Sequence, residues 1–241
     1  MLINCDVKSL EVVVAAELAD DKVLKDELVQ RLDLHDLNQK RFGLPDRVTA
    51  KRFIFKLLYG ATAYGYTTDS DFIGVSFTQK QWQAVIDEFY SKYTGIARWH
   101  AKIEAEAKVN GILTIPSGRY FNYTPTKTQY GWKWPTTKIK NYPVQGFGAD
   151  LVMLARIEAF KQFVQGGYEG CFIQTIHDSI VFDIPANLCY TISMICKNAV
   201  EKVPDLCREH FKYDFTLPLT SEILVGPNKK DLKPYGFSDH N

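Results

Sequence analysis

Strand-forming segments stand near both ends of this chain of 241 residues, and helix-forming segments fill the interval between them. The clearest strand signal is a pair of β-rich runs at 171–184, which flank a tight polar turn and predict a β-hairpin. Further strands are predicted at 2–5 and 217–225, a second hairpin at 112–123, and helices at 10–18, 20–37, 46–60, 79–92, 96–109, 146–165 and 187–203. The sequence contains no internal repeat and no linker that would mark a separate domain. This order favours an α+β fold, or a mixed α/β fold, with a helical insertion.

The predicted helix 46–60 has two distinct faces. Asp46 can cap its start, and a core face is predicted from apolar residues at helical spacing, namely Ala50, Phe53, Ile54 and Leu57. Arg47, Lys51, Phe55 and Tyr59 recur every four residues and form a stripe roughly 130° away from that face. Two cations followed by two rings suit a ligand with phosphates at one end and flat rings at the other. A surface helix with solvated cations explains the pattern equally well.

The charges are balanced in number but uneven in position. Twenty-nine Lys and Arg face 28 Asp and Glu, so any nucleic-acid surface must come from local clustering. Between Lys40 and Lys56 Asp46 is the single acid among six basic residues, and no acid occurs between Glu106 and Asp150. The second segment interleaves cations with aromatic rings: Lys108, Arg119, Lys127, Lys133, Lys138 and Lys140 with Tyr120, Phe121, Tyr123, Tyr130, Trp132, Trp134 and Tyr142. Such a segment suits phosphates and bases, although a solvated aromatic loop is the alternative.

The cysteine pattern and the hydropathy point to an intracellular protein. The five cysteines form no CxxC pair and no metal-binding spacing, which fits reduced and buried thiols. The most apolar early run, residues 10–19, is broken by Glu11 and Glu17, so neither a signal peptide nor a membrane span is expected.

Two carboxylates occupy turn positions. Asp6 ends the first predicted strand, and Asp178 lies in the turn of the 171–184 hairpin. An aspartate at a turn is most often only a turn-former. If the two turns meet, however, the pair makes an oxygen site suited to Mg²⁺, which binds one or two carboxylates and completes its shell with water and substrate phosphates.

Seven segments, in the same order along the chain, resemble motifs of the family A DNA polymerases, the DNA polymerase I type. Three are the polymerase motifs: Asp6-Val-Lys-Ser-Leu-Glu11, Arg47-x3-Lys51-x3-Phe55-x3-Tyr59-Gly60, and His177-Asp178. The others are Asp33-Leu-His35, Gly111-x2-Thr114-x3-Gly118-Arg119, Asn141-x-Pro143-x-Gln145-Gly146-x2-Ala149-Asp150, and the stretch from Pro218-Leu219 to Val225-Gly226. Each motif is weak alone, but the collinear set spans essentially the whole chain.

The resemblance implies an α+β fold of the right-hand polymerase type, with an antiparallel palm sheet and a helical fingers insertion but no thumb or exonuclease domain. On this reading residues 1–34 are palm, 35–140 are fingers and connecting segments around the helix 46–60, and 141–241 are palm around the hairpin 171–184. The implied activity is DNA-directed DNA polymerisation, the template-dependent addition of dNTPs to a primer 3′ end, in DNA replication or repair.

Roles follow from the resemblance, position by position. Asp6 and Asp178 would hold two Mg²⁺ ions. The incoming dNTP would be bound by His35, Arg47 and Lys51 at the triphosphate, with Lys51 as a proton donor to the pyrophosphate, by Phe55 beside the sugar, and by Glu11 as the gate against a ribose 2′-OH. A Phe at position 55 implies discrimination against dideoxynucleotides. Contacts to primer–template DNA would come from Tyr59, Arg119, Asn141, Gln145 and His177.

The sequence also departs from the family pattern. Ser179 stands where the family usually has an acid, which removes one charge near the metals, and Val13 stands where an Arg is common. The chain starts five residues before Asp6. We therefore expect an upstream thumb or exonuclease segment, in a longer chain or as a separate subunit. The compact spacing is more phage-like than bacterial, and the expected location is the cytoplasm of a bacterium or phage-infected host.

Several alternatives stay open at this point. His177-Asp178 also occurs in HD-type metal phosphohydrolases, although those place the pair on a helix with further histidines. A non-catalytic or degenerate DNA-binding remnant of a polymerase is the second alternative. At single positions, His35 can be a helix-surface histidine, Asn141 a helix cap, and Glu11 a solvated helix residue.

Overall fold

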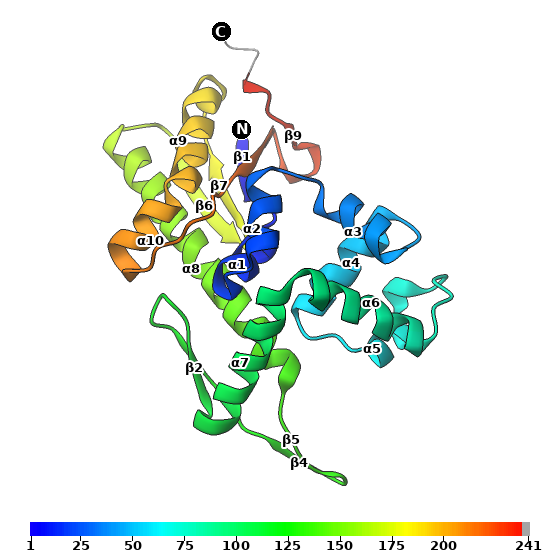
Figure 1. Cartoon of the computed structure of the whole chain (residues 1–241). Coiled ribbons are helices and arrows are strands. Elements are labelled where there is room, and N and C mark those ends of the chain that lie inside the picture. Colours follow the sequence, from blue (N-terminus) through cyan, green and yellow to red (C-terminus); the bar gives the residue numbers. More distant parts are fainter. Residues whose placement is uncertain (238–241) are drawn as a thin grey trace. The chain divides into compact units, whose positions relative to one another are not determined.

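The computed structural model describes residues 1–237, which form two compact units. Unit 1 comprises residues 1–10 and the chain from 146 onward, and unit 2 comprises residues 11–145. The α+β class is confirmed, because unit 1 is built on a sheet and unit 2 is mostly helical (Figure 1). No helix within residues 1–237 has the length and apolar character needed to cross a bilayer.

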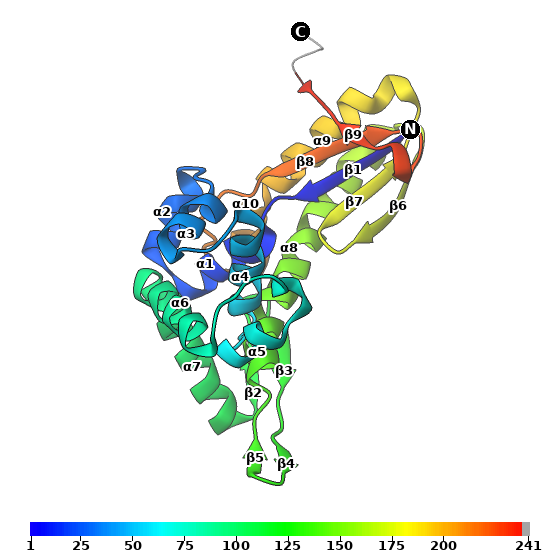
Figure 2. The ribbon, with the colours of Figure 1, turned by 90° about the vertical axis from the view of Figure 1, so that its right-hand side faces the viewer.

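Unit 1 is organised around a five-stranded antiparallel sheet. Its order is β6-β7-β1-β8-β9, formed by Cys171–Ile176, Ser179–Asp183, Leu2–Val7, Ser221–Gly226 and Lys233–Pro234 (Figure 2). Its helices are α9 (Cys189–Glu201), which packs on β1 and β8, α10 (Val203–Phe211), and the later part of α8 (Thr136–Gln165). Short 3₁₀ turns occur at Ala186–Leu188 and Lys229–Asp231.

The first strand shows why this sheet forms. Alternate residues Ile3, Cys5 and Val7 are buried, as a strand with one face on a core requires. Strand β7, which lies between β6 and β1, is buried over four consecutive residues, so both of its faces are covered along this stretch. Four of the five thiols are buried as expected, but Cys171 is exposed because it starts the edge strand β6.

Unit 2 is a cluster of helices with two small hairpins. Its elements are α1 (Leu10–Ala19), α2 (Lys22–Val29), α3 (Leu34–Phe42), α4 (Arg47–Leu58), α5 (Ala63–Thr68), a 3₁₀ turn (Ser70–Phe72), α6 (Gln79–Lys92), α7 (Thr94–Asn110), β2 (Ile112–Thr114), β3 (Tyr120–Asn122), β4 (Thr126–Thr128), β5 (Gly131–Lys133) and the start of α8. An aromatic core made of Phe53, Tyr66, Trp82 and Phe89 holds α4, α5 and α6 together, with ring centroids 4.9–6.1 Å apart. The predicted core face of α4 is therefore correct.

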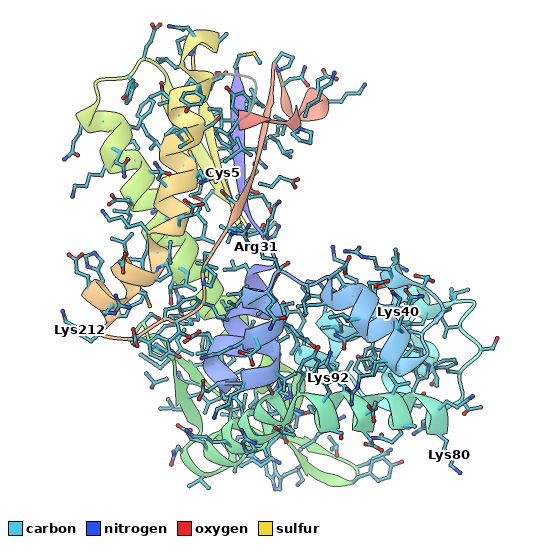
Figure 3. The ribbon with its side chains drawn as sticks, turned by 45° about the horizontal axis from the view of Figure 1, so that its top comes forward. Cys5, Arg31, Lys40, Lys80, Lys92 and Lys212 are labelled. Carbon is cyan, nitrogen blue, oxygen red and sulfur yellow. The ribbon has the colours of Figure 1, made fainter. Side chains whose placement is uncertain are left out.

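Buried polar groups lock the helices of unit 2. The Asp21 carboxylate caps two helices. It accepts the backbone N–H of Leu24 in α2 at 3.0 Å, and it accepts the backbone N–H groups of Gly95 at 2.6 Å and Ile96 at 3.1 Å at the start of α7. A Cβ on Gly95 would lie 2.5 Å from the Cα of Asp21, so this close approach requires glycine. Lys92, labelled in Figure 3, pairs with Glu27 at 2.7 Å and links α6 to α2.

Three predicted boundaries are wrong. The helix expected over 20–37 is two helices, separated by a turn with Arg31 at φ +55°, and the second runs on to Phe42. Helix α8 begins at Thr136 rather than near 146, with Pro143 inside it. The last strand, expected over 217–225, begins only at Ser221.

Candidate functional site

The carboxylates of Asp6 and Asp178 belong to adjacent strand ends in unit 1. Asp6 lies at the end of β1, opposite Ser179, the first residue of β7. The backbone N–H of Val7 donates to the carbonyl of Asp178 at 3.1 Å. The N-terminal strand therefore pairs with the 171–184 hairpin in a register that brings the two turn aspartates to neighbouring positions.

Two further side chains on the sheet surround Asp6. Ser179 is buried, and its hydroxyl donates to Oδ2 of Asp6 at 2.8 Å. Glu222 on β8 is the register partner of Asp6 on the other side, and residues directly opposite each other point to the same face. The sequence predicted neither contact, because both join residues far apart in the chain.

The donor set fits a hard divalent cation that also binds substrate. Within residues 1–237 no cluster of three or more His, Cys, Asp or Glu side chains could hold a metal alone. Mg²⁺ does not need one, because it commonly takes one or two carboxylates and keeps water or phosphate oxygens as its other ligands. Asp6 and Asp178 are both partly exposed, so water and phosphates have access to them.

Four of the predicted nucleotide-binding residues lie on two helices of unit 2, with His35 on α3 and Arg47, Lys51 and Phe55 on α4. The N-cap Asp46 accepts from the Thr49 N–H at 2.8 Å and starts α4, which orients the stripe Arg47, Lys51 and Phe55. The ammonium of Lys51 lies 5.9 Å from the ring centroid of Phe55, and the ring centroids of His35 and Phe55 are 6.2 Å apart.

His35 is held as a neutral imidazole by its surroundings. Burial lowers its pKa below the usual range, and the positive charges of Arg47 and Lys51 lower the pKa further, against an opposing effect of Asp33. Its buried Nδ1 has no hydrogen-bond partner among the described residues. An unpartnered buried polar atom is costly, so this nitrogen is available to a ligand or a water.

Arg47 is not a free cation. Its Nε donates to Oδ2 of Asp33 at 2.8 Å, while Oδ1 of Asp33 accepts the backbone N–H groups of His35 and Asp36, both at 3.1 Å. The hydrogen bond from Arg47 is the main reason that the pKa of Asp33 lies below its usual range. One carboxylate thus caps α3 and neutralises Arg47, a contact that the sequence did not predict.

A second group of predicted residues gathers at the end of α4. The Tyr59 hydroxyl accepts a hydrogen bond from the Gln145 amide of α8. Burial raises the pKa of Tyr59 above its usual range, and the negative charge of Glu11 raises the pKa further. Gly60 follows at φ +82°, where a Cβ would lie 2.9 Å from Cδ of Lys140, so glycine is required.

Three predicted residues remain to be placed, namely Arg119, Asn141 and His177. Arg119 is exposed in the loop between β2 and β3. Asn141 lies inside α8, one turn before Gln145 and on the same face, so the alternative that it caps a following helix is wrong. His177 is exposed in the turn before Asp178, with φ +53°.

Unit 1 thus carries neighbouring carboxylates on an antiparallel sheet, and unit 2 carries a stripe of cations and rings on a helix. Residues 1–231 match the family model described as DNA polymerase family A, and the chain belongs to this family. The match overturns the HD-type phosphohydrolase alternative, and His177-Asp178 lies in a β-turn instead of a helix.

Similar proteins include the DNA polymerase I of Streptococcus pneumoniae strain R6, 27% identical over 225 residues, or 86% of this chain. The DNA polymerase I of Pseudomonas aeruginosa PAO1 is 27% identical over 237 residues, or 94% of this chain. The chain spans 24% of the length of each. A solved structure, the POL domain of Pol1 from M. smegmatis in complex with DNA primer-template and dNTP, has the same fold with a TM-score of 0.77 and 17% identity, covering 92% of this chain and 38% of that one.

Proposed function

We propose that this chain is the catalytic part of a DNA-directed DNA polymerase, which adds dNTPs to a primer 3′ end by phosphoryl transfer with two Mg²⁺ ions, in replication or repair. The observation that supports it most directly is the neighbouring position of Asp6 and Asp178 in a member of DNA polymerase family A.

In this proposal the sheet of unit 1 presents carboxylate oxygens to the metals. Two Mg²⁺ ions, when bound, supply an activated attacking oxygen and neutralise the leaving oxygen. The hydroxyl of Ser179 fixes the orientation of Asp6 by donating to its Oδ2. Because Ser179 is neutral, it does this without adding to the negative charge of Asp6, Asp178 and Glu222.

Unit 2 in this proposal binds the incoming nucleotide. Arg47 and Lys51 attract the triphosphate, the Lys51 ammonium donates a proton to the leaving pyrophosphate, and the neutral His35 donates a hydrogen bond to a phosphate oxygen. Phe55 packs beside the sugar. The variant Phe55→Tyr tests this role, because a hydroxyl there restores a polar contact that a dideoxynucleotide lacks, and we expect easier dideoxynucleotide incorporation.

The residues around the end of α4 are proposed to select a deoxyribose sugar and to contact the template base. Glu11 excludes a ribose 2′-OH, and Tyr59 stacks at the template side, oriented by its hydrogen bond from Gln145. Asn141 extends this face of α8 toward the DNA. His177 contacts the primer end and Arg119 a DNA phosphate.

A further polypeptide is proposed to complete the polymerase, either an upstream thumb or exonuclease segment or a separate subunit. An exposed apolar stripe in unit 1 supports this partner. It is made of Met153, Ile157, Phe160 and Val164 on α8, which are 40–58% exposed. An uncovered patch of this kind is typical of a surface that packs against another polypeptide.

The experiment measures primer extension with Mg²⁺ by the purified chain, with and without the polypeptide encoded upstream. We expect efficient extension only with both. Ile157→Lys should prevent this complementation, whereas Gln165→Lys, which adds the same charge elsewhere on α8, should not. Processive extension by the chain alone would contradict the need for a partner. DNA binding with no nucleotide addition in either mixture would favour the non-catalytic remnant.

A further inference from the structure

The hairpin formed by β4 and β5 carries two aromatic side chains that are largely exposed to solvent. Tyr130 is 91% exposed and Trp132 is 69% exposed, and both belong to unit 2. Figure 2 shows the hairpin at the tip of this unit, beyond β2 and β3 and away from the helices. Large exposed rings close together mark an interaction surface more often than a plain solvated loop.

The strand register places a cation beside one of the rings. Lys127 is the cross-strand partner of Trp132, so the ammonium group and the indole share one face of the hairpin. Lys133 pairs with Thr126 on the opposite face. In the turn, the hydroxyl of Thr128 donates to the Gly131 carbonyl at 2.8 Å and accepts from the Tyr130 N–H at 3.2 Å, which orders the loop that carries the Tyr130 ring.

The cations of the hairpin are available to a ligand. Within the described residues neither Lys127 nor Lys133 of the hairpin forms an ion pair, and the same holds for Lys138 at the start of α8. Lys108 and Lys140 differ, because both pair with Glu104, at 3.5 and 2.7 Å. No acid occurs between Glu106 and Asp150, so the hairpin carries net positive charge.

The chain on either side of the hairpin belongs to a hydrophobic cluster. This cluster joins α7, β2, the end of β3 and the start of α8, with Ile103, Ala107, Leu113, Tyr123 and Ile139 buried and Trp99, Phe121 and Trp134 packed against them. Tyr130 and Trp132 do not belong to this hydrophobic cluster. Their exposed rings therefore have no role in its packing.

We propose that the β4–β5 hairpin is a binding site for single-stranded DNA. Trp132 and Tyr130 stack on unpaired bases, and Lys127 and Lys133 neutralise the adjacent phosphates. The alternation of ring and cation favours a single strand over a duplex, because a duplex hides the flat faces of its bases within the stack. The assignment of this strand as template rests on the proposed polymerase function, whereas the binding itself does not.

The test measures the affinity of the full chain for fluorescently labelled oligothymidine by anisotropy, at several salt concentrations. Trp132→Ala should weaken binding about tenfold, the range expected for the loss of one stacked base, and Trp132→Phe should restore most of it. Tyr64→Ala, which removes a ring that is also 64% exposed in unit 2, serves as the matched control and should leave affinity unchanged. Lys127→Gln should reduce the slope of log affinity against log salt by about 0.7, and Lys80→Gln should not.

Circular dichroism and thermal unfolding check that each variant is folded. Equal affinities of the native chain and a folded Trp132→Ala variant would overturn the proposal. So would hairpin-dependent binding that is as tight for duplex DNA or tighter for RNA, or a loss of self-association in Trp132→Ala with no change in DNA binding. This test measures binding and no nucleotide addition. Hairpin-dependent binding by a chain that adds no nucleotide even together with the further polypeptide would therefore refute the polymerase proposal and leave the binding proposal intact.

Discussion

Replacing Asp33 with Asn should strengthen the binding of a dNTP to unit 2. Asp33 uses its two oxygens for different purposes: Oδ1 caps α3, and Oδ2 accepts from Arg47 at 2.8 Å. Asparagine is as good an N-cap as aspartate, so the variant keeps the cap and removes the charge that competes with the triphosphate for Arg47.

The size of the effect follows from the exposure of the pair. The side chain of Arg47 is 53% exposed and that of Asp33 47%, and an ion pair so open to water contributes roughly 0–1 kcal/mol. Releasing Arg47 should therefore lower the Kd for a dNTP by up to about fivefold. The gain should shrink as salt is raised, because the Debye length falls to about 8 Å at physiological ionic strength.

Equilibrium titration of the chain with a dNTP and Mg²⁺ measures this Kd. Asp36→Asn is the matched control, since it breaks another exposed pair of α3, Asp36 with Lys40 at 2.7 Å, without touching Arg47. Arg47→Gln should weaken binding and cancel the effect of Asp33→Asn in the double variant. Weaker binding in Asp33→Asn would refute the reasoning, because it would mean that Asp33 positions Arg47 and does not compete for it.

Three further outcomes are expected. Glu11→Ala should admit ribonucleotides more readily, and unchanged sugar selectivity in incorporation assays would remove the gate assignment. Burial, assisted by the positive charge of Lys140, lowers the pKa of His100 to about 3, so between about pH 6.5 and 3 the unfolded chain binds a proton that the folded chain does not. The free energy of unfolding, measured with urea, should therefore fall as the pH is lowered, by up to about 1.4 kcal/mol per pH unit. The variant His100→Gln should remove this contribution. Gly60→Ala should destabilise the fold by about 1–2 kcal/mol, measured the same way, because alanine is strained at φ +82° and its Cβ approaches Lys140; an unchanged unfolding midpoint would contradict this.

The elements that the sequence predicts correctly are those set by local signals. The cap Asp46 and the apolar spacing of Phe53 and Leu57 are contained within one helix, and α4 forms as expected. The 171–184 hairpin follows from β-rich runs and a polar turn in the same way. In contrast, the helix expected over 146–165 begins ten residues earlier, at Thr136, and it continues through Pro143 although proline lacks the N–H of an interior helical residue.

The contacts that the sequence does not predict join distant residues. Arg47 reaches Asp33 across 14 positions, Gln145 reaches Tyr59 across 86, and Ser179 reaches Asp6 across 173. Periodicity reports which face of a helix or strand a residue occupies, but the neighbour of that face depends on how the elements pack. The resemblance to a family supplied roles for many of these residues, but it did not supply the partner of Arg47.

The central claim is that the carboxylates of unit 1 serve template-directed nucleotide addition. Its most direct test is single-turnover incorporation of one dNTP into a primer–template by the chain together with the upstream polypeptide, with native protein and with Asp178→Asn. We predict Mg²⁺-dependent addition of the complementary nucleotide by the native protein and loss of addition in Asp178→Asn with unchanged DNA affinity, because the carboxylate serves the metals. Undiminished addition by a folded Asp178→Asn variant would contradict the account.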